Sequence, residues 1–423
     1  MILNNRLRKL FLLATLLPLA AVAEEAAIDF DGHLKSRFLA DVYPDDSALQ
    51  SLAGTSAAGL ESELRLNLSV DKGPWSFDSA WQLYVGYGER IELLRDLAGT
   101  ALPGVSHLPS DDRRLMNLTD TLRDDGKFAA LHRLDRLSVG YTKDNIVLRL
   151  GRQAITWGNG LIFSPMDIVN PFDPTAVDTE YKAGDDMFYG QYLLSNGHDI
   201  EVAHVFRRDL QTGDPASAKA TTAIKYHGIS QNAEYDLLIS DNYDTTTIGI
   251  GGNRNIGGAV LRGDVVWADT ASGSKLQLVT NLSYSWIWGG KNMSGVLEYY
   301  FTEFGQRAGR YDFASLSQNI ELLERLERGE VFTLGRNYLA GGVTIEMSPL
   351  WMVTPNLFVN LDDGSALLQV VSRNNLSDNA EFLTALNLPL GPGGTEFGGI
   401  EAGIPGSYLS TDFSLFAQFA WYF

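Results

Sequence analysis

The amino-acid sequence predicts an all-β protein, a transmembrane antiparallel β-barrel of about eighteen strands with short periplasmic turns and long external loops. Three observations lead to this prediction. The chain ends in a strand of alternating aromatic residues, it begins with an export signal, and between them apolar and polar residues alternate with a period of two. The 42 glycines and the 11% aromatic content fit one continuous β domain, with no linker of the Pro/Ser/Gly type.

The first 23 residues are typical of a secretory signal peptide. They carry three basic residues, then an apolar run, then the small-residue pattern Ala21-Val22-Ala23. Cleavage is expected after Ala23, which leaves residues 24–423 as the barrel. No later stretch of 18 apolar residues occurs, so a helical membrane protein is excluded. The predicted location is the outer membrane of a Gram-negative cell.

The body of the chain is a series of predicted hairpins. Sixteen strands are the alternative if the weak segments 245–255 or 379–390 are misread. A soluble sandwich is disfavoured because segments of this length are long for packed sheets. The predicted strands are roughly 28–42, 59–71, 75–88, 132–143, 145–157, 186–195, 198–209, 218–229, 232–242, 245–255, 258–269, 275–288, 291–304, 336–348, 351–361, 365–376, 379–390 and 412–423.

The two faces of these segments predict what each side chain meets. Charged residues of both signs share one parity, and aliphatic residues flanked by aromatics share the other, as a lipid-facing band requires. The side chains expected to face water inside are Glu63, Arg65, Arg262, Asp264 and Glu298. Those expected to face lipid are Leu66, Leu278, Trp286 and Leu297.

The connections alternate between short and long. Short turns are expected near 72–74, 143–145, 195–198, 229–232, 255–258, 289–291, 348–351 and 376–379. The long links are 43–58, 89–131, 158–185, 305–335 and 391–411. Helices are expected over 315–329, 91–97 and 115–122, and a β-bulge is expected at Pro355, because proline lacks a ladder donor.

The last strand, Asp412 to Phe423, carries an assembly signal. Phe419, Trp421 and Phe423 lie on one parity with other apolar residues. The strand resembles the closing strand of bacterial outer-membrane β-barrels, and this resemblance implies recognition of its terminal aromatics by the barrel insertion machinery. An edge strand of a soluble sandwich is the alternative.

The stretch from Leu148 to Asp186 is the predicted site of function. A strand passes through Trp157-Gly158 into a loop stiffened by three prolines, and we expect this loop, near 158–186, to fold inward and narrow the lumen. An outer cap is the alternative. The residues expected to form the constriction are Arg149, Gln153, Asp167, Asp173, Asp178, Arg207 and Lys225, with the acids opposite the cations.

The Gly-Arg-Gln and Trp-Gly patterns of this stretch resemble outer-membrane channels of the alginate-export and DUF1302-like group. The resemblance covers some forty residues and the general barrel plan, and it implies a porin-like channel. The dense charge clusters expected of an alginate conduit are not obvious in the sequence.

Other function classes find little support. The formal net charge of −19 disfavours nucleic acid as a partner. The absence of cysteine excludes disulfides and zinc–thiolate sites. The histidines are scattered (His33, His107, His132, His198, His204 and His227), so no catalytic, metal or cofactor site is expected.

The sequence therefore predicts a porin-like channel for passive passage of small or elongated hydrophilic solutes. Its expected partners are outer-membrane lipid and lipopolysaccharide, and its oligomeric state is left open. The alternative is an outer-membrane conduit or receptor component of an envelope export or lipid-transport complex, without an open pore.

Overall fold

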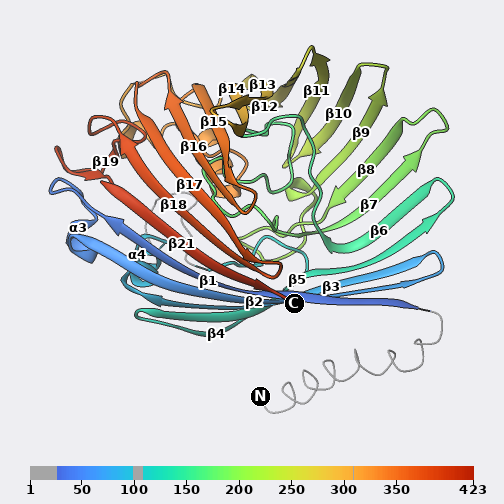
Figure 1. The fold of residues 1–423 in the computed structure, drawn as a ribbon, viewed down its shortest axis with the longest axis horizontal. Coiled ribbons are helices and arrows are strands. Elements are labelled where there is room, and N and C mark those ends of the chain that lie inside the picture. Colours follow the sequence, from blue (N-terminus) through green and yellow to red (C-terminus); the bar gives the residue numbers. More distant parts are fainter. Residues whose placement is uncertain (1–25, 99–107, 308) are drawn as a thin grey trace.

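The computed structural model describes residues 26–98, 108–307 and 309–423. The predicted signal peptide and His107 lie outside these residues. Eighteen antiparallel strands form a closed barrel, as the sequence predicts (Figure 1). One further strand, β4 (Thr119–Asp125), extends the wall locally by pairing with β5 alone.

Each of the eighteen predicted segments coincides with one strand of the barrel. The period-two alternation is responsible, because it specifies both the strand and the face that turns inward. The barrel strands are β1 (Ala27–Val42), β2 (Ser56–Lys72), β3 (Trp75–Gly88), β5 (Phe128–Lys143), β6 (Ile146–Gln153), β7 (Asp185–Leu193), β8 (Asp199–Val205), β9 (Thr221–Ile229), β10 (Ala233–Asn242), β11 (Thr245–Ile256), β12 (Ala259–Thr270), β13 (Gly273–Trp288), β14 (Lys291–Thr302), β15 (Asn337–Ser348), β16 (Trp351–Asn360), β17 (Ala366–Ser377), β18 (Ala380–Leu390) and β21 (Phe413–Tyr422).

The ring closes between the first and last strands. β21 pairs with β18 on one side and with β1 on the other. The closure extends to the last residue, because Gly32 and Phe423 exchange two backbone hydrogen bonds of 2.8 and 3.0 Å. Phe419, Trp421 and Phe423 are 40%, 46% and 50% exposed on the outer surface.

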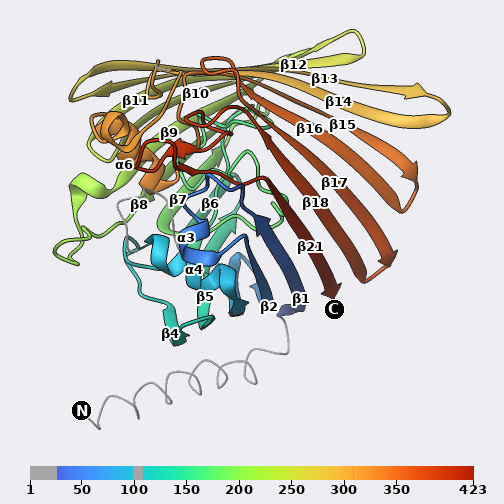
Figure 2. The same cartoon turned by 90° about the vertical axis from the view of Figure 1, so that its left-hand side faces the viewer.

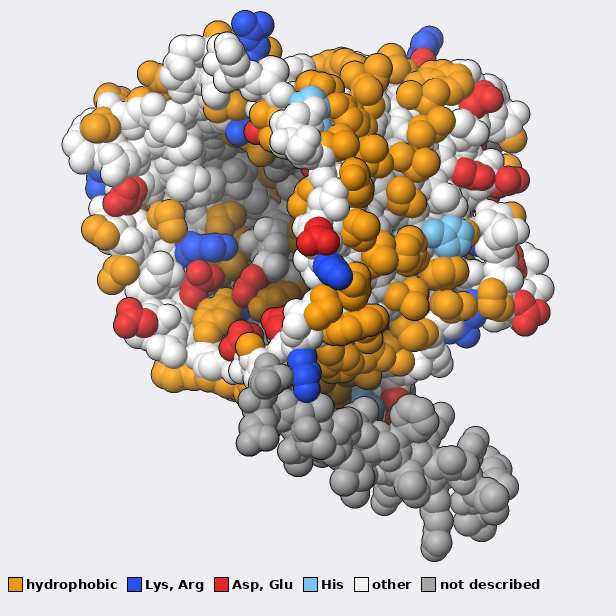
Figure 3. All heavy atoms as spheres, turned by 90° about the vertical axis from the view of Figure 1, so that its right-hand side faces the viewer, with side chains coloured by type: hydrophobic (Ala, Val, Ile, Leu, Met, Phe, Trp, Pro, Cys, Tyr) orange, Lys and Arg blue, Asp and Glu red, His pale blue; other side chains and the backbone are white. Residues whose placement is uncertain are grey.

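Side chains alternate between a charged interior and an apolar exterior. Glu63, Arg65, Asp264 and Glu298 are buried, and Arg262 donates to Ser283 of the neighbouring strand. Figure 3 shows a hollow edged by acidic and basic side chains, beside a wall covered by hydrophobic ones. On that outer parity Leu297 is 56% exposed, with Leu66, Leu278 and Trp286 on the same face of their strands.

The five long links expected from the sequence leave the same end of the barrel, as does the link between β8 and β9 (residues 206–220), and short turns close the other end. The long-link end carries the helices α3 (Gln50–Ala53), α4 (Glu89–Ala98), α5 (Phe313–Leu316) and α6 (Ile320–Arg328), and the short pair β19 (Ile400–Glu401) and β20 (Tyr408–Leu409) (Figure 2). A 3₁₀ turn covers Ser217–Lys219. Among the described residues, no helix is long and apolar enough to cross a bilayer.

Four local predictions are corrected. The helix expected over 315–329 is two helices, because Asp312 and Asn319 each cap a separate N-terminus. The helix expected over 115–122 is absent, and β4 starts within it. The strand expected to reach Trp157 ends at Gln153. No bulge forms at Pro355, because the pairing with β15 lapses there and resumes in the same register.

Candidate functional site

The link between β6 and β7, residues 154–184, runs inside the ring of strands (Figure 1). We call it the inner segment. Its first part, the wall limb (residues 154–169), lies along the inner faces of β7 to β14. Its second part, the crossing limb (residues 171–181), reaches strands on the far side of the barrel.

Inward-facing carboxylates hold the wall limb. Glu201 on β8 accepts the indole N–H of Trp157 at 2.8 Å, and Asp264 on β12 accepts the backbone N–H of Asn159 at 2.7 Å. Glu298 on β14 accepts three consecutive backbone N–H groups, of residues 161–163, at 2.6 to 3.1 Å. These charged acceptors satisfy loop amides that the barrel would otherwise leave buried and unpaired.

Apolar contacts complete the attachment of the wall limb. Met166 is fully buried in a cluster that the limb forms with inward-facing residues of β7 to β12. Phe163 stacks on Tyr300, with ring centres 4.6 Å apart. Packing and hydrogen bonds therefore both hold the wall limb in place, and the limb forms a rigid lining on this side of the lumen.

The crossing limb is tied to the opposite wall mainly by charge. The carboxylate of Asp178 lies 2.7 Å from the ammonium of Lys35 and 3.1 Å from the guanidinium of Arg37, both on β1. Burial raises the pKa of Asp178, but the hydrogen bond from Lys35 and the charges of the two cations together outweigh it and lower the pKa to about 2. Further along, the carbonyl of Thr175 accepts from Gln369 on β17, and Tyr181 lies under the guanidinium of Arg65.

A buried ion pair joins the residues on either side of the crossing limb. The ammonium of Lys182 lies 2.6 Å from the carboxylate of Asp167 and also donates to the carbonyl of Ile155. Burial is the larger influence on both groups: it raises the pKa of Asp167 to about 6 and lowers that of Lys182. The pair closes the limb at its base, beside the contact of Asn170 with the carbonyl of Ala183.

The structure does not bring the predicted acids against the predicted cations. Asp167 pairs with Lys182 and Asp178 with β1, while Asp173 is exposed and accepts from Thr175. Arg207 pairs with Asp185 at 3.1 Å, and Lys225 pairs with Glu201 at 2.8 Å. The loop acids therefore do not lie opposite the predicted cations, and each of these charged groups that forms an ion pair does so with a different partner.

Arg149 and Gln153, both on β6, differ from the other predicted residues. The guanidinium of Arg149 lies 4.8 Å from the centre of the Tyr189 ring. Among the described residues, no carboxylate forms an ion pair with it. Gln153 is buried and donates to the carbonyl of Met187. Arg149 is therefore a half-buried inward cation without an ion-pair partner among the described residues.

Three inward-facing side chains hold the inner segment: Lys35, Arg37 and Glu298. Lys35 and Arg37 were not predicted from the sequence as site residues. The available signal was parity, because His33, Lys35 and Arg37 occupy successive inward positions of the first strand. Glu298 was predicted to face inward, but its backbone partners lie more than 130 residues away.

The mouth at the long-link end contains a cavity of about 370 Å³. Arg113, Arg114, Arg207 and Arg328 line it together with Asp185 and Glu327. The ring of Tyr243 lies between two of these guanidinium groups, 4.6 Å from Arg207 and 4.1 Å from Arg328. Charges of both signs therefore surround the entrance. No group of acidic or histidine side chains suited to a metal occurs among the described residues.

No family model and no curated protein matches the sequence. The structure is similar to solved β-barrels at about one residue identity in ten. Pseudomonas aeruginosa OccK5 (OpdH) matches over 95% of this chain and 98% of its own, with 10% identity and a TM-score of 0.55. A BenF-like porin from Pseudomonas fluorescens matches over 95% and 99%, with 8% identity and a TM-score of 0.51.

A third solved structure with this fold is Wzi from Escherichia coli, an outer-membrane protein involved in group 1 capsule assembly and described as a carbohydrate-binding β-barrel. It matches over 96% of this chain and 87% of its own, with 11% identity and a TM-score of 0.53. The chain therefore has the closed eighteen-strand β-barrel fold of outer-membrane porins.

Proposed function

We propose that this protein is a porin-like channel of the outer membrane for passive passage of small or elongated hydrophilic solutes. The observation that carries the proposal is a closed barrel with an apolar exterior and a charged interior, crossed by one segment tied to both walls. The apolar exterior fits lipid, and the charged interior fits water. The fold shared with solved porins supports the same reading.

The inner segment supplies the selectivity in this proposal. A solute passing the crossing limb meets the ion pairs that Asp178 and Glu180 form with the cations of β1. Fixed charges of both signs beside a water-filled passage orient dipolar solutes and filter them by charge. Arg149 adds to the lumen a positive charge that forms no ion pair among the described residues. Passage requires no energy source, because it follows the solute gradient.

A second function has one observation in its favour. The wall limb builds an apolar cluster inside the barrel, with Trp157, Met166 and Ile168 against Met187 and Val205. An inward apolar surface fits a conduit or receptor component of an envelope export or lipid-transport complex without an open pore.

Proteoliposome swelling separates the two functions. The mature chain is refolded into liposomes and diluted into isosmotic glucose or glycine. The porin proposal expects swelling at a rate that rises with protein content and falls with solute size. Intact liposomes with correctly folded protein would instead favour the closed conduit or receptor. Heat-modifiable migration on gels serves as the folding control.

A further inference from the structure

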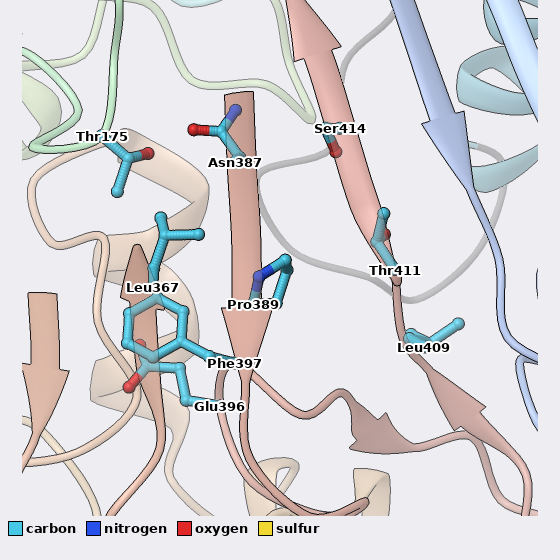
Figure 4. Close-up of a pocket in the computed structure, with 9 residues that line it drawn as sticks. All are labelled: Thr175, Leu367, Asn387, Pro389, Glu396, Phe397, Leu409, Thr411 and Ser414. Carbon is cyan, nitrogen blue, oxygen red and sulfur yellow. The ribbon is translucent and has the colours of Figure 1, made fainter. Parts of the chain in front are cut away.

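A cavity of about 290 Å³ lies on the inner side of the wall near the long-link end. Figure 4 shows Asn387 and Pro389 on β18, and Thr411 and Ser414 along the stretch that enters β21. Glu396 and Phe397, from the link between these strands, cover it. Thr175 of the crossing limb also lines it, so the cavity adjoins the segment that narrows the lumen.

The polar side chains of the cavity have unused hydrogen-bonding capacity. Among the described residues, the hydroxyls of Thr411 and Ser414 and the amide of Asn387 make no hydrogen bond to protein, and the amide oxygen of Asn387 is buried. A buried amide oxygen without a partner is costly, and a ligand hydroxyl would relieve that cost. Asparagine both donates and accepts, and so do hydroxyls, which suits a ligand rich in hydroxyl groups.

Among the described residues that line the cavity, Glu396 is the one ionisable side chain, and its carboxylate already accepts hydrogen bonds from the protein. The carboxylate of Glu396 accepts from Tyr338, from Asn360 at 2.7 Å and from the backbone N–H of Leu334 at 2.9 Å. A cationic ligand would compete with these three donors, and an anionic ligand would meet a carboxylate with no lining lysine or arginine to offset it. The cavity therefore favours an uncharged ligand.

Apolar groups form the remaining lining. Leu367, Pro389, Phe397 and Leu409 present aliphatic and aromatic surface to the same space. A sugar ring combines hydroxyl edges with faces of C–H groups, and it matches a site that offers hydrogen bonds on some sides and apolar contact on others. The volume accommodates one such ring.

We infer that this cavity binds a neutral sugar or polyol unit at the mouth of the channel. Asn387, Thr411 and Ser414 would hydrogen-bond its hydroxyls, and Phe397 and Leu367 would pack on its C–H face. The inference deepens the proposed function, on which it rests, by naming uncharged, hydroxyl-rich compounds as the solute class.

Calorimetric titration of the refolded mature chain in detergent tests the inference. Glucose and glucitol are the probes, and glutamate and lysine are the charged comparisons. We expect heat of binding from the two neutral probes only. Asn387→Leu and Phe397→Ala should each weaken glucose binding about tenfold, the equivalent of one lost hydrogen bond or ring contact. The matched control is Asn374→Leu on β17, whose amide contacts Ser372 away from the cavity.

The outcomes separate the inference from the proposed function. No binding of either neutral probe, equal binding of the charged compounds, or wild-type affinity in both cavity variants would overturn the sugar site, whether or not the protein conducts. Sugar binding that is lost in Asn387→Leu and Phe397→Ala supports the site even in a protein that fails to swell liposomes, in which case only the channel proposal falls. Phe397 lies in a link outside the barrel strands, so its variant keeps the test valid if Asn387→Leu fails to fold.

Discussion

At the scale of single residues, Arg149 places a positive charge on the inner face of the barrel. Its guanidinium faces Tyr189, and no described carboxylate pairs with it. Arg149→Gln should therefore shift ion selectivity towards cations, because the lumen loses a positive charge. Reversal potentials across a KCl gradient measure this shift. Arg123→Gln changes the same charge on β4, outside the ring, and should leave the potential unchanged.

The two faces of β14 should differ in their tolerance of a charged side chain. Leu297 is 56% exposed on the outer face, and Ser294 shares the inward parity of Glu298. Leu297→Arg should lower the free energy of unfolding by roughly 2–4 kcal/mol if the position lies near the bilayer midplane. Ser294→Arg should cost much less, because water reaches it. Urea titration in lipid vesicles compares the two, and a larger cost at Ser294 would mean that the register is inverted.

Glu396 makes the mouth sensitive to pH. Burial raises the pKa of its carboxyl to about 7, from an ordinary value near 4.5. A raised pKa means that the folded link holds the proton more tightly, so this stabilisation is complete below about 4.5 and is lost as the pH rises through about 7. Hydrogen-exchange protection of residues 391–412, corrected for intrinsic rates, should therefore fall between pH 5 and pH 8.

Glu396→Gln should abolish that pH dependence, because the amide stays neutral throughout the range. Glu401→Gln in the same link is the control and should keep the pH dependence; among the described residues, its carboxylate accepts a hydrogen bond from Gly406 alone. A wild-type link whose protection is flat across this range would contradict the assignment to Glu396.

At the scale of elements, the strands were predictable and the path of the inner segment was not. Period-two alternation is a local property of the sequence. The stretch from Leu276 to Trp288 therefore predicts both a strand and its outer face, without information from any other part of the chain. The partners of Asp178 depend on how far the crossing limb reaches, and Lys35 is 143 residues away. Proline content indicated a stiff loop, but stiffness does not specify which cations it meets.

For Glu298, the sequence predicts the direction of the side chain but not its hydrogen-bond partners. Its inward direction follows from parity, yet its task of accepting three loop amides follows only from the position of residues 161–163. The break between α5 and α6 had a readable signal, because Asn319 is a good N-cap in the middle of the apolar periodicity.

At the scale of the whole molecule, the last strand closes the barrel, and its terminal residue takes part in the closure. Phe423 exchanges two backbone hydrogen bonds with Gly32. Deleting Phe423 should therefore impair assembly, with loss of the heat-modifiable band in membrane fractions. Leu415→Ala, on the same face of β21 but far from the terminus, should assemble. Normal folding of the deletion variant would count against the terminal strand as the assembly signal.

We propose that the crossing limb sets the bore of an open channel. Because the Asp167–Lys182 pair closes the base of the limb, residues 171–181 can be replaced by Gly-Ser-Gly while that base is kept. The deciding measurement is single-channel conductance in planar bilayers. We predict discrete steps from the wild-type protein and larger steps from the shortened variant. Folded wild-type protein without steps, or equal steps from both proteins, would contradict the claim.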